Sequence, residues 1–507
     1  MEFNYNKTHS NKFILFYRNF LCIYMDIIFA FLFVTFVFCS VNGSNENVLY
    51  WLLYATYFNI ILYLIIKGVK DNISFFLFAV AFFTFLMGSK LFFFININEK
   101  NIFTLFIKTE LNSKDYILFV SLLFFSLTSS YIAYRMAKFL QGKKKIENKS
   151  VDFSKYAKMK GIIKFLFPIF LMACLIEAYM SWRYIGNVGY VDSYVQNIKI
   201  PIFISKPAAL FPALILIFCA LEPKRDEIKL ATKYYFISLI CTVFTGRRTD
   251  LVIGILFIVW YLCVVDNRQI FNKKFLTNRR MVLLGSGTLL FISFLGAFSF
   301  IRAEVQANSL SIMDYINFFF TSLGRSDSVV ADTIIYQDVF PKNGINYLFY
   351  PIKDFLSSNI FTRGIYELLT GLQNYTSVGQ GLSKLSLTDS FSHWLTYIVA
   401  PSLYIKGHGL GSSFISETFI AFGLTGVIVY SAILGILLSS LLGSSVQSLR
   451  RKILLMVIFK SILFAPRGPA LGFIDNLYEI VLTYILLYFV SLIFTKAKGV
   501  YSGEQIR

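Results

Sequence analysis

Residues 21–41 read LCIYMDIIFAFLFVTFVFCSV, an apolar run in which Asp26 is the only charged residue. A helix of about 20 apolar residues spans the hydrocarbon core of a membrane. Windows of this kind recur along the whole chain, so we predict an all-α polytopic membrane protein with about twelve transmembrane helices. The predicted spans are residues 21–41, 48–66, 73–95, 116–134, 162–180, 202–221, 233–245, 251–265, 281–301, 414–442, 453–465 and 477–494.

The composition excludes a soluble enzyme. Of the 507 residues 56% are hydrophobic and 15% charged, with a mean hydropathy of +0.64, whereas soluble domains have roughly a quarter charged residues. The six cysteines all fall within predicted spans, so we expect no disulfide framework. The three histidines are scattered and have no neighbouring cysteines, so we expect no metal site and no cofactor.

The strong positive charge is explained by membrane topology. Lys and Arg number 48 against 28 Asp and Glu, a net charge of +20 that in a soluble chain would suggest nucleic acid. Here the basic residues concentrate in the segments that face the cytoplasm if the N-terminus does, so both termini are predicted to be cytoplasmic. The tracts at 143–145 and 273–274 are expected to fix this topology and to touch anionic lipid, with no nucleic-acid partner.

The chain divides into three predicted regions. Residues 1–301 hold nine spans, residues 302–413 form a large late loop on the outer side of the membrane, and residues 414–507 hold three spans. A loop of this length is too long for a passive linker. Its apolar patches at 316–320 and 394–399 predict helices that lie on or dip into the membrane surface. His393, beside Trp394, is interpreted as a residue of the membrane interface.

Arginines without neighbouring lysines mark the outer ends of the predicted spans. A guanidinium group binds phosphate through two parallel hydrogen bonds, so these arginines predict a site for a diphosphate. The alternative is that Arg247 or Arg248 pairs with Asp250, and that the other acidic neighbours form similar ion pairs at helix ends. The motifs are Thr245–Asp250 with Arg247 and Arg248, Arg302 with Glu304, Arg325 with Asp327, and Arg467 in the short loop 465–469.

A second motif is rich in glycine. Residues 407–413 read GHGLGSS and precede Glu417, Gly423 and Gly426, where a span begins. His408 and Glu417 are candidate proton acceptors at the membrane surface. Alternatively, Glu417 complements the helix dipole and the two glycines permit close helix packing.

The run 407–413, with Glu417 and the glycines 423, 426 and 435, resembles the C-terminal signature of Wzy-type O-antigen polymerases. The turn 245–248 and the late outward loop are similar to that family as well. The resemblance implies a GT-C-like fold in the bacterial inner membrane. It also implies a metal-independent glycosyltransferase that moves a growing glycan from undecaprenyl diphosphate onto the non-reducing end of a lipid-linked repeat unit at the periplasmic face.

The resemblance and the residues together assign expected roles. The five arginines 247, 248, 302, 325 and 467 would stabilise the leaving diphosphate, and Glu417 or His408 would accept the proton, with Glu304 and Asp327 as substitutes. The partners are a lipid-linked oligosaccharide and membrane lipid, with a chain-length regulator left open. The rival functions are an O-antigen ligase and a lipid-linked oligosaccharide flippase, although a flippase should carry its cations in a central cavity.

Overall fold

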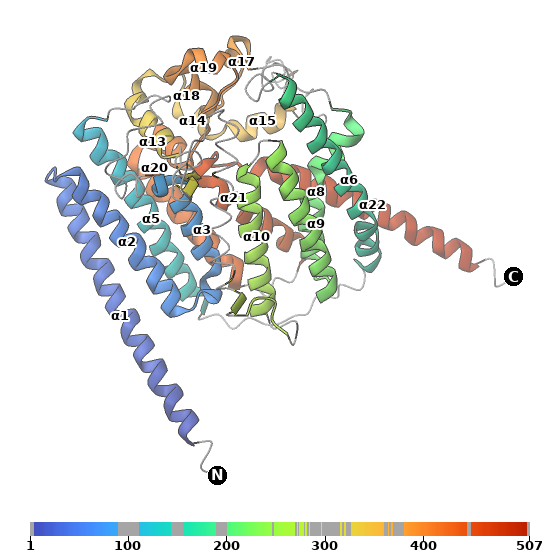
Figure 1. Cartoon of the computed structure of the whole chain (residues 1–507), viewed down its shortest axis with the longest axis horizontal. Helices are drawn as coiled ribbons and strands as arrows, with labels where there is room; N and C mark the ends of the chain where they lie inside the picture. Colours follow the sequence, from blue (N-terminus) through green and yellow to red (C-terminus); the bar gives the residue numbers. More distant parts are fainter. Residues whose placement is uncertain are drawn as a thin grey trace.

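A computed structural model shows a bundle of long helices with a group of short helices at one end (Figure 1). No strand occurs within the described part of the chain. That part comprises residues 5–89, 111–142, 156–188, 200–245, 248–268, 271, 273–277, 279–280, 283, 296, 315–316, 319–320, 326–358, 364, 367–368, 380–443 and 448–503.

Eight helices among the described residues are long and apolar enough to cross a membrane. They begin and end close to the predicted spans, because the length of an apolar run is itself the signal for a span. The long helices are α1 (Tyr5–Val41), α2 (Glu46–Lys67), α3 (Ile73–Phe82), α5 (Ser113–Gly142), α6 (Ala157–Val188), α8 (Ile202–Ala220), α9 (Arg225–Phe244), α10 (Arg248–Asn267), α20 (Phe414–Gly443), α21 (Leu449–Phe464) and α22 (Phe473–Gly503).

The remaining predicted spans are not among these eight. Helix α9 starts with the charged run Arg225–Glu227, helix α21 has 16 residues, and the apolar part of α22 is Leu477–Ile493. The predicted span 281–301 lies almost entirely outside the described residues. The predicted number of about twelve spans therefore stays a prediction.

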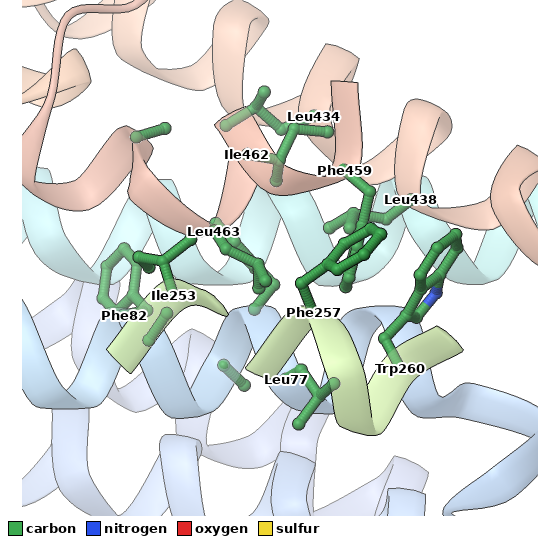
Figure 2. Packing of buried hydrophobic residues seen from close by; sticks show 14 of the residues in the cluster. Leu77, Phe82, Ile253, Phe257, Trp260, Leu434, Leu438, Phe459, Ile462 and Leu463 are labelled. Atoms are coloured by element: carbon green, nitrogen blue, oxygen red, sulfur yellow. The ribbon is translucent and has the colours of Figure 1, made fainter. Parts of the chain in front are cut away.

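The centre of the bundle is built by α3, α10, α20 and α21 (Figure 2). Trp260 of α10 stacks on Phe459 of α21 with ring centroids 4.3 Å apart, and its indole N–H donates to the Ser74 hydroxyl of α3. Helix α20 lies against α5 so closely that a Cβ atom on Gly435 would be 2.1 Å from the carbonyl oxygen of Ser130. Small residues permit this close helix packing.

Helix α1 lies at the edge of the bundle and exposes a row of large apolar side chains, including Phe20, Ile27 and Phe31. Such a face suits contact with lipid. One charged pair ties α1 to the bundle, because Asp26 is bonded to Arg135 of α5. The Arg135 guanidinium also lies over the ring of Tyr63 at 4.3 Å.

Short helices from the predicted outward loop cover one end of the bundle, which we call the capped end; the opposite end is the open end (Figure 1). Tyr347, Phe391 and Leu395 build a small core of their own within this cap. Lys342 and Lys353 both bind the Asp389 carboxylate, which joins three cap segments. The cap helices are α13 (Ser326–Ile335), α14 (Gly344–Leu348), α15 (Tyr350–Ser358), α17 (Leu382–Leu387), α18 (Phe391–Val399) and α19 (Pro401–Ile405).

Candidate functional site

Glu417 lies at the capped end, near the start of α20, and its side chain is almost fully enclosed, with 2% exposed. Each carboxylate oxygen accepts one hydrogen bond. The Ser412 hydroxyl donates to Oε1 at 2.6 Å, and the backbone N–H of Ala470 donates to Oε2 at 2.8 Å. A buried carboxylate is costly unless its oxygens are satisfied in this way, so Glu417 fixes Ser412 and Ala470 relative to each other.

Ala470 belongs to the loop between α21 and α22, which contains the predicted site residue Arg467. The loop starts with a 3₁₀ turn, η6 (Ala465–Arg467), and ends where α22 begins at Phe473. The Tyr430 hydroxyl of α20 donates to the Ala470 carbonyl oxygen. Two α20 side chains therefore hold the N–H and the C=O of the same loop residue.

A break in α20 at Gly423 allows Glu417 and Tyr430 to bond to the same residue, Ala470. Gly423 has φ 64° and ψ −157°, a positive-φ conformation that is essentially restricted to glycine. A straight helix would separate the Cα atoms of Phe414 and Tyr430 by about 24 Å at 1.5 Å per residue. Their ring centroids are only 5.6 Å apart, so the segment before Gly423 folds back towards the one after it.

This break corrects the expected shape of the segment 414–442. The predicted boundaries agree with those of α20, but the expectation of one continuous helix was wrong, because Gly423 interrupts it. Gly426, after the break, packs against the segment before it, since a Cβ there would lie 2.6 Å from the Thr418 carbonyl oxygen. Among the predicted glycines it is Gly435 that provides close packing between helices, against α5.

Four elements meet around Glu417 and Arg467 at the capped end. Helix α13 contacts α20 and the π-helical turn η3 (Phe83–Met87), and η6 contacts the same two elements. On α13, Asp327 is buried and accepts a hydrogen bond from Ser89 at 2.6 Å. The fold thus brings the elements that carry Asp327, Glu417 and Arg467 into one junction, although they come from separate parts of the sequence.

His408 lies in the glycine-rich loop that leads into α20. Its backbone N–H donates to the Leu403 carbonyl, and its own carbonyl accepts from the side chain of Gln380 at 2.7 Å. Gly407 and Gly411, on either side of it, have φ values of 92° and 90°, so the loop needs glycine at both positions. The His408 side chain is half-buried, and the hydrogen bonds described for Glu417 do not include it.

Arg248, the first residue of α10, is also at the capped end and is half-buried. None of the ion pairs that the structure describes joins it to Asp250. Asp250 instead interacts electrostatically with Lys460 of α21, which also interacts with Glu479 of α22 and Tyr235 of α9. Side chains of four helices thus meet around Lys460, seven residues before Arg467 in the sequence.

The other predicted site residues, Arg247, Arg302, Glu304 and Arg325, lie outside the described residues. His393, expected at the membrane interface, is in α18, and its Nδ1 lies 3.1 Å from the Tyr404 hydroxyl. Burial, together with the nearby Lys384 charge, lowers the pKa of His393 to about 4. It is therefore a neutral residue of the cap.

Sequence reasoning missed Tyr430, Ala470 and the bond from Ser412 to Glu417. Ala470 acts through its backbone groups, which every residue type except proline carries, so its identity gives no signal. Tyr430 is one of 31 tyrosines, and nothing in the sequence distinguishes it from the others. The glycine spacing pointed to this region, because Gly423 and Gly426 follow Glu417 within one short segment.

Comparison with known proteins bears directly on this site. No curated protein and no solved structure matches the chain. The family model described as O-antigen polysaccharide polymerase Wzy matches residues 23–498, which include every element of the Glu417 site and nearly the whole chain. The chain therefore belongs to the O-antigen polysaccharide polymerase Wzy family.

Proposed function

We propose that the capped end faces the periplasm and joins undecaprenyl-diphosphate-linked O-antigen repeat units into a polymer. Family membership supports the role of an O-antigen polymerase of the glycosyltransferase type, and it agrees with a multi-pass membrane protein. The proposal that the capped end holds the reaction site rests on the Glu417–Ala470 hydrogen bond. This bond fixes the loop of Arg467 at the junction of α13, η3, η6 and α20.

The proposed orientation follows from the distribution of charge. Lys70, Lys160 and Arg268 cluster at the open end, where their side chains bond to the turns between long helices. Basic residues favour the cytoplasmic side of a membrane. The capped end is then periplasmic, and both termini are cytoplasmic, in the bacterial inner membrane.

The proposed reaction breaks the bond between the anomeric carbon of the growing glycan and the carrier diphosphate. The acceptor hydroxyl of the incoming unit forms the new bond to that carbon and gives its proton to a base, while the carrier leaves as the diphosphate. Guanidinium groups stabilise the charge that develops on the leaving phosphate. In this proposal Arg467 and Arg248 supply that charge together with Arg247, Arg302 and Arg325, and no step requires a metal.

The geometry changes the proposed role of Glu417. Both of its oxygens already accept hydrogen bonds and its side chain is buried, so we assign it to positioning the Arg467 loop. His408 is then the proposed base, since it is half-buried and lies in the same loop as Ser412, between α19 and α20. Asp327 and Glu304 are the alternatives.

The test of the function is a cell that lacks this gene. A polymerase defect leaves a single repeat unit on the surface glycan, because the unit is still made and attached. Complete absence of surface glycan would instead indicate a ligase or a flippase. Complementation with the unmodified chain should restore long polymers.

A further inference from the structure

A groove between α9 and α10, near the open end, has no part in the proposed reaction. It encloses about 650 Å³, and the two helices that form it lie side by side in Figure 1. Its α10 wall is Ile255, Ile258, Val259 and Leu262. These positions follow helical spacing, so one apolar face of α10 is turned towards the groove.

The α9 wall changes from apolar to basic towards the open end. Lys229, Thr232, Lys233 and Phe236 line the groove from one face of α9, and both lysines lie nearer the helix start than Phe236. Lys229 pairs with Asp226 at 2.7 Å. Lys233 and Arg280, both exposed at the groove, have no carboxylate partner in the part of the chain that the structure describes.

The end of the groove is built as a fixed floor. Phe275 and Leu276 line it, and their backbone N–H groups donate to the two oxygens of Asp266 at 2.7 and 2.8 Å. Lys70 binds the Leu276 carbonyl, and Arg280 binds the Phe275 carbonyl at 2.8 Å. These bonds within the chain hold the floor of the groove in place, and a preformed site lowers the entropic cost of binding a ligand.

We propose that this groove binds one acidic phospholipid of the adjacent membrane leaflet. The phosphate lies between Lys233 and Arg280, and an acyl chain lies along Ile255, Ile258 and Leu262. Basic pockets between transmembrane helices suit anionic lipid head groups. An apolar wall beside two cations that have no carboxylate partner among the described residues matches both halves of such a lipid. The site is at the opposite end of the bundle from Glu417, so it does not depend on the proposed reaction.

The test is native mass spectrometry of the full-length protein, purified in detergent and titrated separately with phosphatidylglycerol, phosphatidylethanolamine and farnesyl phosphate. The variants are Lys233→Ala, Lys233→Ala with Arg280→Ala, and Ile258→Trp, which fills the groove and keeps both charges. Lys158→Ala is the matched control, because Lys158 is an exposed lysine at the open end of α6. Lys233→Ala breaks no hydrogen bond or ion pair among the described residues, so it reports on binding without disturbing the fold.

The proposal predicts one retained phosphatidylglycerol, about fivefold weaker binding in Lys233→Ala and at least about tenfold weaker binding in the double variant. Ile258→Trp should also weaken binding, and Lys158→Ala should behave as the unmodified protein. Equal binding of phosphatidylethanolamine, unchanged binding in the double variant, or an equal loss in Lys158→Ala would overturn it. So would a preference for farnesyl phosphate over phosphatidylglycerol.

Discussion

Glu417 and Tyr430, on either side of the Gly423 break in α20, hold the two backbone groups of Ala470. The carboxylate takes the N–H and the phenol binds the carbonyl oxygen. This pair of contacts fixes the short loop that carries Arg467. Because the loop also joins α21 to α22, the position of Arg467 depends on helix packing as well as on local sequence.

The first prediction concerns Glu417. Glu417→Gln keeps one acceptor oxygen, so chain elongation should fall about tenfold, whereas Glu417→Ala leaves two buried donors unpaired and should cost about a hundredfold. The measurement is the rate of polymer elongation in membranes with matched protein levels. If Glu417 were the base, the Gln variant would be as inactive as the Ala variant.

The second prediction concerns the Tyr430 hydroxyl. Tyr430→Phe retains the ring that packs on Phe414 but loses the bond to Ala470, so elongation should fall about fivefold, as expected for one hydrogen bond. Tyr179→Phe, on the exposed face of α6, is the control and should elongate normally. Identical rates in the two variants would show that Tyr430 does not position the loop.

The third prediction uses Gly423. A Cβ is disfavoured at φ 64°, so Gly423→Ala should lower the free energy of unfolding by about 1–2 kcal/mol and should reduce elongation. Gly161→Ala is the matched control, since a Cβ at Gly161 of α6 meets nothing within 4 Å. It should leave stability unchanged or raise it slightly. Equal stability of both variants in thermal unfolding would argue against a strained break.

The fourth prediction concerns pH. Because burial and Lys384 lower the pKa of His393 to about 4 in the folded protein, the unfolded chain, with a histidine pKa of about 6.5, binds more protons between these values. Stability should therefore fall as the pH drops from about 6.5 towards 4. His393→Gln should make this fall shallower in thermal unfolding measured at several pH values. The same pH dependence in both proteins would assign it to other groups.

The sequence predicted the helices well where an apolar run alone determines them. Residues 48–66 were predicted as a span and α2 is Glu46–Lys67. The break at Gly423 was not predictable in the same way, because apolar residues continue on both sides of it. The role of Ala470 was hidden as well, since its backbone groups find their partners only after α20 folds back.

The candidate site was predictable in its residue types more than in its geometry. Arg467 was singled out as an arginine at the outer end of a span, and Glu417 as a carboxylate that follows a glycine-rich motif where a span begins. Their link through Ala470 depends on chain segments far apart in sequence. Glu417 was expected to act on substrate, whereas its buried carboxylate, with both oxygens bonded, favours a positioning role.

The most direct test of the account is polymer length in cells that carry Arg467→Ala in place of the unmodified chain. Arg183→Ala is the control, because Arg183 is an exposed arginine near the C-terminal end of α6, which lies at the capped end of the bundle. We expect single-repeat glycan for Arg467→Ala, at normal levels of inserted protein, and normal polymers for Arg183→Ala. Polymers of normal length in Arg467→Ala would contradict the claim that the Glu417–Ala470 contact serves to place a diphosphate-binding arginine.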